Sequence, residues 1–413
     1  MKFVSTREDS PAVPFSEALA AGLAPDGGLY VPEAFPSVEA GDVAARTLAG
    51  VAAEVLVPFF EGDRLAGSLA EICQGAFSFP APLVDAGGFH VLELFHGPTA
   101  AFKDVGACFL AECMVRVDQE PRTVLVATSG DTGGAVAAAF HRKPGIEVVI
   151  LYPQGGVSPE QEQQLTCWGD NVSAFAVRGV FDDCQRLLKE ALASGLGDRQ
   201  LTTANSINIA RLLPQMTYYA YAALCHGGEP TFVVPTGNVG NATAALWARR
   251  LGFPIRSVVM VTNANRTVPE YLASGDWQPR PSQATLANAM DVGDPSNMER
   301  VFAMYPQVAD LREHVMSVSV DDSCIEATIL AGQRRCDRVL DPHTATAVYA
   351  LDVLDIEQPV VVATAHAAKF ESVVAPLIEG ALEIPESLAR IRERESHFVE
   401  IEPDLEALRR ALG

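Results

Sequence analysis

The 413-residue sequence has little positive charge and no long hydrophobic segment. Lys and Arg total 30 against 52 Asp and Glu, so the formal net charge is −22. A chain this acidic is repelled by phosphate backbones and anionic lipids, which argues against nucleic-acid and membrane partners. No apolar run approaches the roughly 18 residues that a membrane span needs, and the first residues lack an apolar stretch of signal-peptide length. We therefore expect a cytoplasmic protein.

Disulfide and metal-binding patterns are also missing. The eight Cys residues include no C-x-x-C pair, so we expect reduced and mostly buried thiols. His90, His96 and Asp104 are close in sequence, but no H-E-x-x-H or comparable ligand spacing is present, and no metal is expected. The composition, 48% hydrophobic and 20% charged, is typical of a globular protein.

From about residue 90, short β-branched runs alternate with helical patterns. This alternation predicts an α/β fold with largely parallel, buried sheets. The predicted strands are Val91–Phe95, Thr123–Ala127, Glu147–Leu151, Val172–Val177, Thr231–Val234, Ser257–Val261 and Pro359–Ala363. The first 80 or so residues instead contain Ala-rich helical stretches such as Val43–Phe60, and the Pro-rich segment Phe79–Pro82 marks a boundary.

The passage around Lys103 is the first candidate for chemistry. A predicted strand ends at Phe95, a Gly-Pro turn follows, and a helix is expected to begin near Ala100. Lys103 then lies in the first helical turn, where the helix dipole and burial both favour the neutral amine. A neutral lysine amine is what Schiff-base chemistry needs. The alternative is a surface lysine paired with Asp104.

Two Gly-rich passages each connect a predicted strand to a predicted helix. In VATSGDTGG at 126–134, small residues at a helix start expose N–H groups that suit a carboxylate or phosphate, while Asp131 is an alternative helix cap. In VVPTGNVGNAT at 233–243, two Gly and two Asn tolerate positive φ and favour an anion-binding nest. The second passage is neither a Walker loop nor G-x-G-x-x-G, so a phosphate without Mg²⁺ is expected. Each passage is also compatible with a plain tight turn.

The passage ANSINIAR at 204–211 is a candidate for a second anion site. Arg211 lies about one turn into a predicted helix, from which its guanidinium can clamp an anion. The alternative is that Asn205 and Ser206 cap this helix and Arg211 lies at the surface.

Thr364 lies where the last predicted strand meets a helix, as the residues of the two Gly-rich passages do. A Thr at a strand end is usually structural. His366, two residues later, is interpreted as a hydrogen-bonded core histidine.

Together these passages resemble the pyridoxal-phosphate enzymes of the tryptophan-synthase-β fold type, and closely the threonine synthase family. The combination of HGPT-x-x-FKD with SGDTG is specific to that family, and weaker similarity extends along almost the whole chain. The matching segments are HGPTAAFKD at 96–104, ATSGDTGGAVA at 127–137, ANSINIARL at 204–212, TGNVGN at 236–241, ATLANAMDVG at 284–293 and ATAHAAKF at 363–370. The family is expected to have Pro where Ala367 stands.

The resemblance implies a fold of type II, with parallel-rich sheets flanked by helices and a mostly helical N-terminal segment. It also implies three domains. These are a mostly helical domain at 1–82, a large cofactor-binding α/β domain at 83–103 and 212–413, and a smaller α/β domain at 104–211 that closes over the substrate.

The resemblance further implies pyridoxal 5′-phosphate as cofactor and a role for each site residue. Lys103 is the lysine that joins the cofactor covalently, and Thr364 faces the pyridine nitrogen. The cofactor phosphate is held by Gly237, Asn238, Val239, Gly240 and Asn241. The loop near the substrate carboxylate comprises Thr128, Ser129, Gly130, Asp131 and Thr132. The substrate phosphate is bound by Asn205, Ser206 and Arg211.

The reaction implied by the resemblance is the last step of threonine biosynthesis, in a monomer or homodimer. It converts O-phospho-L-homoserine and water into L-threonine and phosphate, by γ-elimination and β-addition of water. The alternatives are a serine/threonine dehydratase, a lyase of the same fold that degrades O-phosphohomoserine, and a non-catalytic module that binds a small anion. A dehydratase has no need of the 205–211 cluster, because its substrate carries no phosphate.

Overall fold

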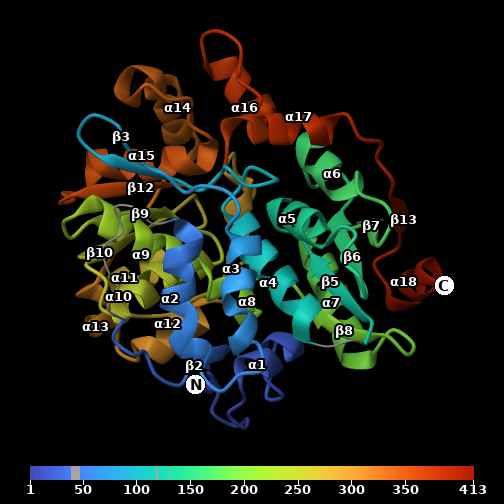
Figure 1. Cartoon of the computed structure of the whole chain (residues 1–413). Coiled ribbons are helices and arrows are strands. Elements are labelled where there is room, and N and C mark those ends of the chain that lie inside the picture. The colour runs from blue at the N-terminus through green and yellow to red at the C-terminus, as the bar shows by residue number, and fades with distance from the viewer. Residues whose placement is uncertain (39–46, 118–119, 129) are drawn as a thin grey trace.

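A six-stranded sheet forms the larger half of the molecule (Figure 1). The computed structural model describes residues 1–38, 47–117, 120–128 and 130–413. The strand order is β11 (Val315–Ser319), β10 (Ser257–Thr262), β9 (Thr231–Pro235), β12 (Pro359–Ala363), β4 (His90–Glu93) and β3 (Leu83–Asp85). Neighbouring strands are parallel except β3, which is antiparallel to β4. The loops that follow β4, β9 and β12 therefore meet at one edge of this sheet, where ligands of open α/β sheets bind.

A second, five-stranded sheet lies beside the first and is entirely parallel (Figure 1). Its order is β13 (Val399–Ile401), β7 (Val172–Val177), β6 (Ile146–Pro153), β5 (Arg122–Ala127) and β8 (Gln200–Thr203). The loop after β5 contains the SGDTG passage, and the loop after β8 contains the ANSINIAR passage. Two further strands, β1 (Phe3–Ser5) and β2 (Tyr30–Pro32), form a separate antiparallel pair.

Helices cover both sheets (Figure 1). The helices are α1 (Phe15–Ala21), α2 (Leu48–Phe60), α3 (Leu69–Ala76), α4 (Lys103–Val117), α5 (Asp131–Phe140), α6 (Pro159–Thr166), α7 (Phe181–Ser194), α8 (Ile209–Leu212), α9 (Gln215–His226), α10 (Gly240–Arg250), α11 (Thr267–Ser274), α12 (Met298–Met304), α13 (Val308–Arg312), α14 (Asp322–Cys336), α15 (Pro342–Val353), α16 (Glu371–Val374), α17 (Glu386–Arg392) and α18 (Leu405–Leu412). The 3₁₀ helices are η1 (Ala66–Ser68), η2 (Asn288–Met290), η3 (Ala367–Phe370) and η4 (Ala375–Leu377). No helix built from the described residues is long and apolar enough to cross a membrane.

The predicted α/β fold with parallel sheets is confirmed. Each of the seven predicted strands is present, as β4, β5, β6, β7, β9, β10 and β12. The N-terminal part is mostly helical as expected, although α2 begins at Leu48, after Thr47 accepts a hydrogen bond from the Gly50 N–H at 3.2 Å. Residues 43–46 of that predicted helix lie outside the described residues.

The C-terminal segment differs from the predicted domain division. The prediction places 212–413 in the large domain, yet β13 pairs with β7 in the smaller sheet. Ile401 and Leu408 are buried in the hydrophobic cluster of that sheet, and Arg178 pairs with Glu400 at 3.0 Å. The exposed edge of β7 provides unpaired backbone groups, which this distant segment satisfies.

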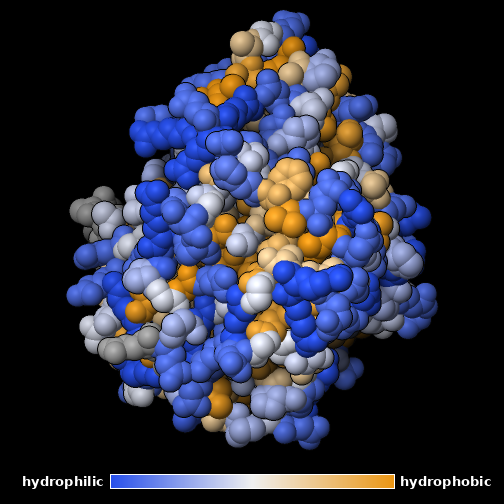
Figure 2. Space-filling model, turned by 90° about the vertical axis from the view of Figure 1, so that its right-hand side faces the viewer, coloured by the Kyte–Doolittle hydropathy of each residue, from blue (hydrophilic) through white to orange (hydrophobic). Residues whose placement is uncertain are grey.

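The face around β13 and α18 turns toward the viewer in Figure 2. It is mostly hydrophilic, with hydrophobic side chains gathered along its middle. Large exposed hydrophobic side chains of the chain include Val180, Phe398 and Val399. The predominance of hydrophilic groups on this face agrees with the strongly acidic composition.

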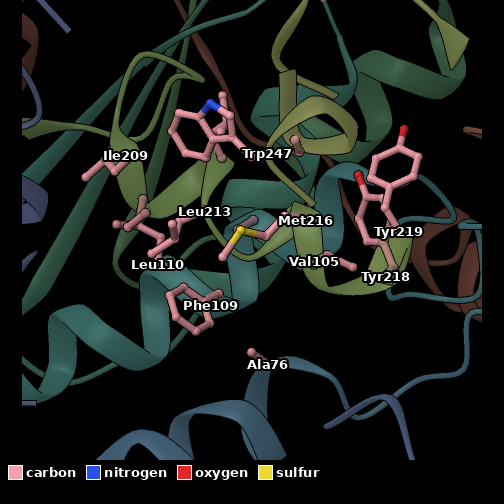
Figure 3. Packing of buried hydrophobic residues seen from close by; sticks show 14 of the residues in the cluster. Ala76, Val105, Phe109, Leu110, Ile209, Leu213, Met216, Tyr218, Tyr219 and Trp247 are labelled. Atoms are coloured by element: carbon pink, nitrogen blue, oxygen red, sulfur yellow. The ribbon is translucent and has the colours of Figure 1, made fainter. Parts of the chain in front are cut away.

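The helix α4, which begins at Lys103, lies inside the largest hydrophobic cluster. Figure 3 shows Phe109 and Leu110 of α4 among side chains from Ala76, Leu213 and Met216. The Phe109 ring also lies 6.2 to 6.3 Å from three rings of the N-terminal part, those of Phe15, Phe60 and Phe77. Packing on several sides fixes the start of α4, and with it the backbone of Lys103.

Replacing Phe109 with Ala is expected to reduce the free energy of unfolding by about 3–5 kcal/mol, because it leaves a cavity among these rings. Urea denaturation followed by circular dichroism measures the change. Leu330→Ala is the control, since that side chain is 50% exposed and its loss should have little effect. Equal losses for the two variants would contradict the role of Phe109.

Candidate active site

One pocket lies between the two sheets and contains nearly all the site residues that were predicted. Its walls come from the loops and helix starts after β4, β5, β8, β9 and β12, with further residues from α7, α9, α15 and the segment 289–296. The predicted residues that line it are Lys103, Thr128, Asp131, Thr132, Asn205, Ser206, Arg211, Gly237, Asn238, Val239, Gly240, Asn241 and Thr364. Gly130 lies next to the pocket wall without lining it, and Ser129 lies outside the described residues.

The turn before Lys103 is built around a buried carboxylate. Asp104 accepts hydrogen bonds from the Thr99 N–H at 2.9 Å and the Thr99 hydroxyl at 2.6 Å. A Cβ on Gly97 would lie 2.4 Å from the Asp104 Oδ2, so this position needs glycine. The helix begins at Lys103, later than the predicted start near Ala100. Because Asp104 is buried and bound to Thr99, the alternative of a surface Lys103–Asp104 pair is wrong.

The Lys103 amine faces the pocket with its pKa lowered, as its position predicts. Burial lowers this pKa most, and the nearby cations Lys369 and Arg211 lower it further, while Asp131 raises it. Its Nζ makes no hydrogen bond or ion pair with any described residue, and lies 5.8 Å from the centre of the Phe102 ring. The site therefore favours the neutral, nucleophilic amine.

The loop after β9 has the geometry of an anion cradle. A Cβ on Gly237 would lie 2.7 Å from the Met290 Cα, so only glycine fits beside that backbone. Val239 has a φ of +62°, which is rare for a β-branched residue and turns the chain into the start of α10. Strained backbone at a helix start is typical of phosphate-binding loops.

Asn241 provides this loop with a buried donor that has no acceptor. Its Oδ1 accepts from the hydroxyls of Tyr218 and Tyr219, the second at 2.9 Å. Its Nδ2 is buried and finds no acceptor among the described residues. A phosphate oxygen in the pocket would satisfy that donor.

The loop after β5 is folded by Thr128 and by glycine. The Thr128 hydroxyl accepts from the N–H groups of Gly130 and Gly133, both at 3.0 Å. A Cβ on Gly133 would lie 2.5 Å from a methyl carbon of Leu165, so a residue larger than glycine does not fit at this position. Asp131 does not cap α5, so that alternative is wrong. Its carboxylate forms an ion pair with Lys369 at 3.3 Å instead.

Asp131 is ionised although it is only 5% exposed. Burial raises its pKa most, but the charges of Lys369, Lys103 and His343 together outweigh that effect, and the pKa falls to about 2. The pocket therefore has a negative charge in its wall, close to Lys103.

Asn205 and Ser206 line the pocket but are bound to other parts of the site. The Asn205 Nδ2 donates to the Ala127 carbonyl at 2.9 Å, which extends the pairing between the ends of β5 and β8. The Ser206 hydroxyl accepts from the Asn238 Nδ2 at 2.8 Å and so joins the two loops. The cap of α8 is Asn208, so the alternative that Asn205 and Ser206 cap this helix is wrong.

Arg211 is 2% exposed, so the alternative of a surface arginine is also wrong. Burial lowers its pKa to about 10, and the guanidinium remains a cation at neutral pH. One nitrogen donates to the Ala204 carbonyl, while the buried Nε has no acceptor among the described residues. A cation with a free, buried donor beside the pocket can bind an anion.

Thr364 follows β12 directly, as predicted, and lies in the pocket wall. Its carbonyl accepts from the Phe102 N–H at 2.8 Å, which ties the end of β12 to the start of α4. His366 lies outside this pocket and accepts through Nδ1 from the Ala368 N–H at 3.2 Å. This bond agrees with the structural interpretation of His366.

Two further groups at the site were missed by the sequence reasoning. His343 lines the pocket, bonded through Nδ1 to Asp341 at 2.9 Å and accepting through Nε2 from the Ala289 N–H at 3.1 Å. Lys369 is buried behind Asp131. The Asp341-Pro342 pair signals a helix start, but no local pattern shows that either side chain reaches the site.

Profiles of known families match the whole length of the chain. The profile of pyridoxal-phosphate-dependent enzymes matches residues 79–365, and those of the threonine synthase N terminus and C-terminal part match 2–77 and 344–412. The threonine synthase of Escherichia coli K12 is 37% identical over 428 residues, covering 100% of this chain and 99% of the relative. The chain belongs to the threonine synthase family of pyridoxal-phosphate-dependent enzymes.

Other members of the threonine synthase family agree in sequence and in structure. The enzyme of Haemophilus influenzae is 39% identical, with 99% of both chains covered. The pyridoxal-phosphate-bound threonine synthase from Brucella melitensis superimposes with a TM-score of 0.93 at 34% identity, covering 100% of this chain and 98% of that one. The yeast enzyme gives 0.91 at 30% identity, with coverages of 100% and 98%.

Enzymes outside the threonine synthase family share the fold alone. Threonine deaminase from Solanum lycopersicum gives a TM-score of 0.56 at 15% identity, covering 75% of this chain and 93% of that one. The family's cofactor fits the pocket, because the Gly237 cradle, the free Nδ2 of Asn241 and the unpaired Lys103 amine match its phosphate and aldehyde. Fold type II and the pyridoxal-phosphate assignment are thus confirmed.

Gly237→Ala is expected to weaken pyridoxal-phosphate binding at least tenfold, because the new Cβ collides with the backbone at Met290. Equilibrium dialysis against the cofactor measures this affinity. The matched control is Gly67→Ala, where a Cβ meets nothing within 4 Å. Unchanged affinity in the folded Gly237 variant would show that this loop does not hold the phosphate.

Proposed function

We propose that this chain is a threonine synthase that converts O-phospho-L-homoserine and water into L-threonine and phosphate. The observation that carries the proposal is the placement of one unpaired lysine amine between two anion-binding groups in a single pocket. The cradle at 237–241 fits the cofactor phosphate, and Arg211 fits the phosphate of the substrate. A substrate without phosphate would leave the buried Arg211 Nε unsatisfied.

Lys103 performs two tasks in this proposal. Its Nζ would hold the cofactor through the aldehyde carbon, and once free, the same nitrogen would take the proton from the substrate Cα and serve again at Cβ. The cofactor, when bound, supplies the electron sink that stabilises charge on the substrate carbons. Burial lowers the pKa of Lys103, and a lowered pKa increases the share of neutral amine that can accept a proton.

Arg211 promotes departure of the phosphate from Cγ. Arg211 lines the pocket, where its cation would stabilise the charge that develops on the leaving group. The Asn205 amide is already bonded to Ala127, so its part is to hold the end of β5 against this loop. Ser206 links the substrate side of the pocket to the cofactor loop through Asn238.

The loop at 128–132 would receive the substrate carboxylate through backbone N–H groups at the start of α5. The carboxylate of Asp131 would repel the substrate, but its ion pair with Lys369 reduces that repulsion. Thr364 would place a hydroxyl at the cofactor ring nitrogen. A hydroxyl leaves this nitrogen largely unprotonated and disfavours transamination.

The domain division belongs to the same proposal. A large domain would bind the cofactor, and a smaller domain would close over the substrate. In this scheme residues 399–412 would belong to the smaller domain, a placement supported by the pairing of β13 with β7 and the burial of Leu408 in the same hydrophobic cluster.

Borohydride treatment of the protein loaded with pyridoxal phosphate should fix the cofactor on Lys103, because reduction makes that link permanent. Peptide mass spectrometry locates the adduct. Lys103→Ala should abolish it, while the control Lys189→Ala, at an exposed lysine, should retain it. An adduct on another amine would refute the assignment of Lys103.

Product analysis separates the proposed reaction from the alternatives. The protein should release one phosphate and one threonine for each O-phospho-L-homoserine consumed, and little ammonia from threonine. Formation of 2-oxobutyrate in place of threonine would instead identify a degradative lyase.

Arg211→Ala is expected to raise the KM for O-phospho-L-homoserine at least tenfold, because a charge-assisted contact to phosphate is lost. The absorbance of the bound cofactor should stay unchanged, since the cofactor phosphate lies at 237–241. Steady-state phosphate release and an absorbance spectrum measure the two effects. Loss of the cofactor spectrum in a folded variant would show that Arg211 has been assigned to the wrong ligand.

A further inference from the structure

Lys369 is a completely buried lysine at the junction of the two sheets, with 0% of its surface exposed. It lies in η3, just after β12 and Thr364. Its Nζ donates to the Thr99 carbonyl at 2.6 Å and to the Gln164 Oε1 at 2.8 Å, and lies 3.3 Å from the Asp131 Oδ1. The first two contacts are hydrogen bonds and the third is an ion pair, so the buried ammonium group is surrounded by three oxygens.

Lys369 and Lys103 share the same acidic neighbour. The charged groups that act on Lys103 are Asp131 of α5, Lys369 of η3 and Arg211 of α8. Asp104, next to Lys103 in α4, is held by Thr99. Asp131 is thus the carboxylate that can serve Lys103 as a counter-ion, and its ion pair is with Lys369.

We propose that Lys369 is a positioning residue for Lys103: it binds the Asp131 carboxylate and thereby offsets the negative charge that would otherwise act as a full counter-ion to the reactive amine. The inference rests on the proposed function, because it explains how the lysine of that site stays nucleophilic. Without Lys369, a buried anion would remain near Lys103, and taking a proton onto Lys103 would relieve it.

The same contacts set the position of Lys103 as well as its charge. Through Thr99, Lys369 is joined to the turn that binds Asp104, the residue after the reactive lysine. Through Gln164 and Asp131, it is joined to α6 and α5 of the smaller sheet. One buried cation therefore connects both sheets at the pocket.

The test measures the reactivity of Lys103 in the full-length, cofactor-free chain. Trace acetylation with acetic anhydride over a pH range, read by peptide mass spectrometry, reports the pKa of that amine without requiring activity. Lys369→Met removes the charge but keeps a similar length. We expect it to slow Lys103 acetylation at neutral pH about tenfold or more, which corresponds to a pKa higher by about one unit or more.

A double variant separates electrostatics from disturbed packing. Lys369→Met with Asp131→Asn removes both charges, and acetylation should return to within about threefold of the unchanged protein. Asp131→Asn alone leaves Lys369 as an unpaired cation beside Lys103 and His343, and should speed acetylation. Lys189→Met, which removes an exposed charge, should change nothing.

Wild-type reactivity in a folded Lys369→Met protein would overturn the inference, as would a double variant as slow as the single one. If Lys369→Met fails to fold, the Asp131→Asn variant becomes the test. Unchanged or slower acetylation of Lys103 in that variant would reject the proposal. The borohydride experiment fails independently, because it reports where the cofactor binds and not the pKa of the amine.

Discussion

In the proposed reaction, the amine of Lys103 has to stay uncharged beside two groups that would bind anions. Each bound phosphate would raise the pKa of a nearby lysine, so burial alone would not keep that pKa lowered once the ligands are bound. Arg211 opposes this effect from one side, and Lys369 opposes it by occupying Asp131. In the proposed scheme, the requirement for a neutral amine accounts for the two buried cations, Arg211 and Lys369, that act on Lys103.

The proposed cofactor-phosphate site would bind its anion with backbone more than with charge, which reconciles the net charge of −22 with a phosphate ligand. The loop at 237–241 relies on a glycine cradle, a strained Val239 and the start of α10. Such a site is local and desolvated, so the acidic surface far away acts on it only weakly. Parallel strands bring several such loops together, since the loops at their carboxyl ends all open toward the same edge of the sheet.

The fold and much of the site could be predicted because their signals are local. The predicted strands are nearly continuous apolar runs, and glycines mark the turns that follow them. Strands without such runs were missed, such as β8 with its sequence QLTT and the half-exposed edge strand β11. The contact of β13 with β7 joins residues more than 200 positions apart, which no local pattern encodes.

The sequence by itself determined the family and the parallel α/β architecture and predicted Lys103 as the reactive lysine, because motif spacing and hydrophobic periodicity depend on neighbours along the chain. Only the tertiary structure decided which charges meet. Asp131 could have capped α5, but it forms an ion pair with Lys369 from another loop. Arg211 could have lain at the surface, but other parts of the fold bury it. Burial and ion pairing depend on distances across the fold, and these arise only when both sheets pack around the pocket.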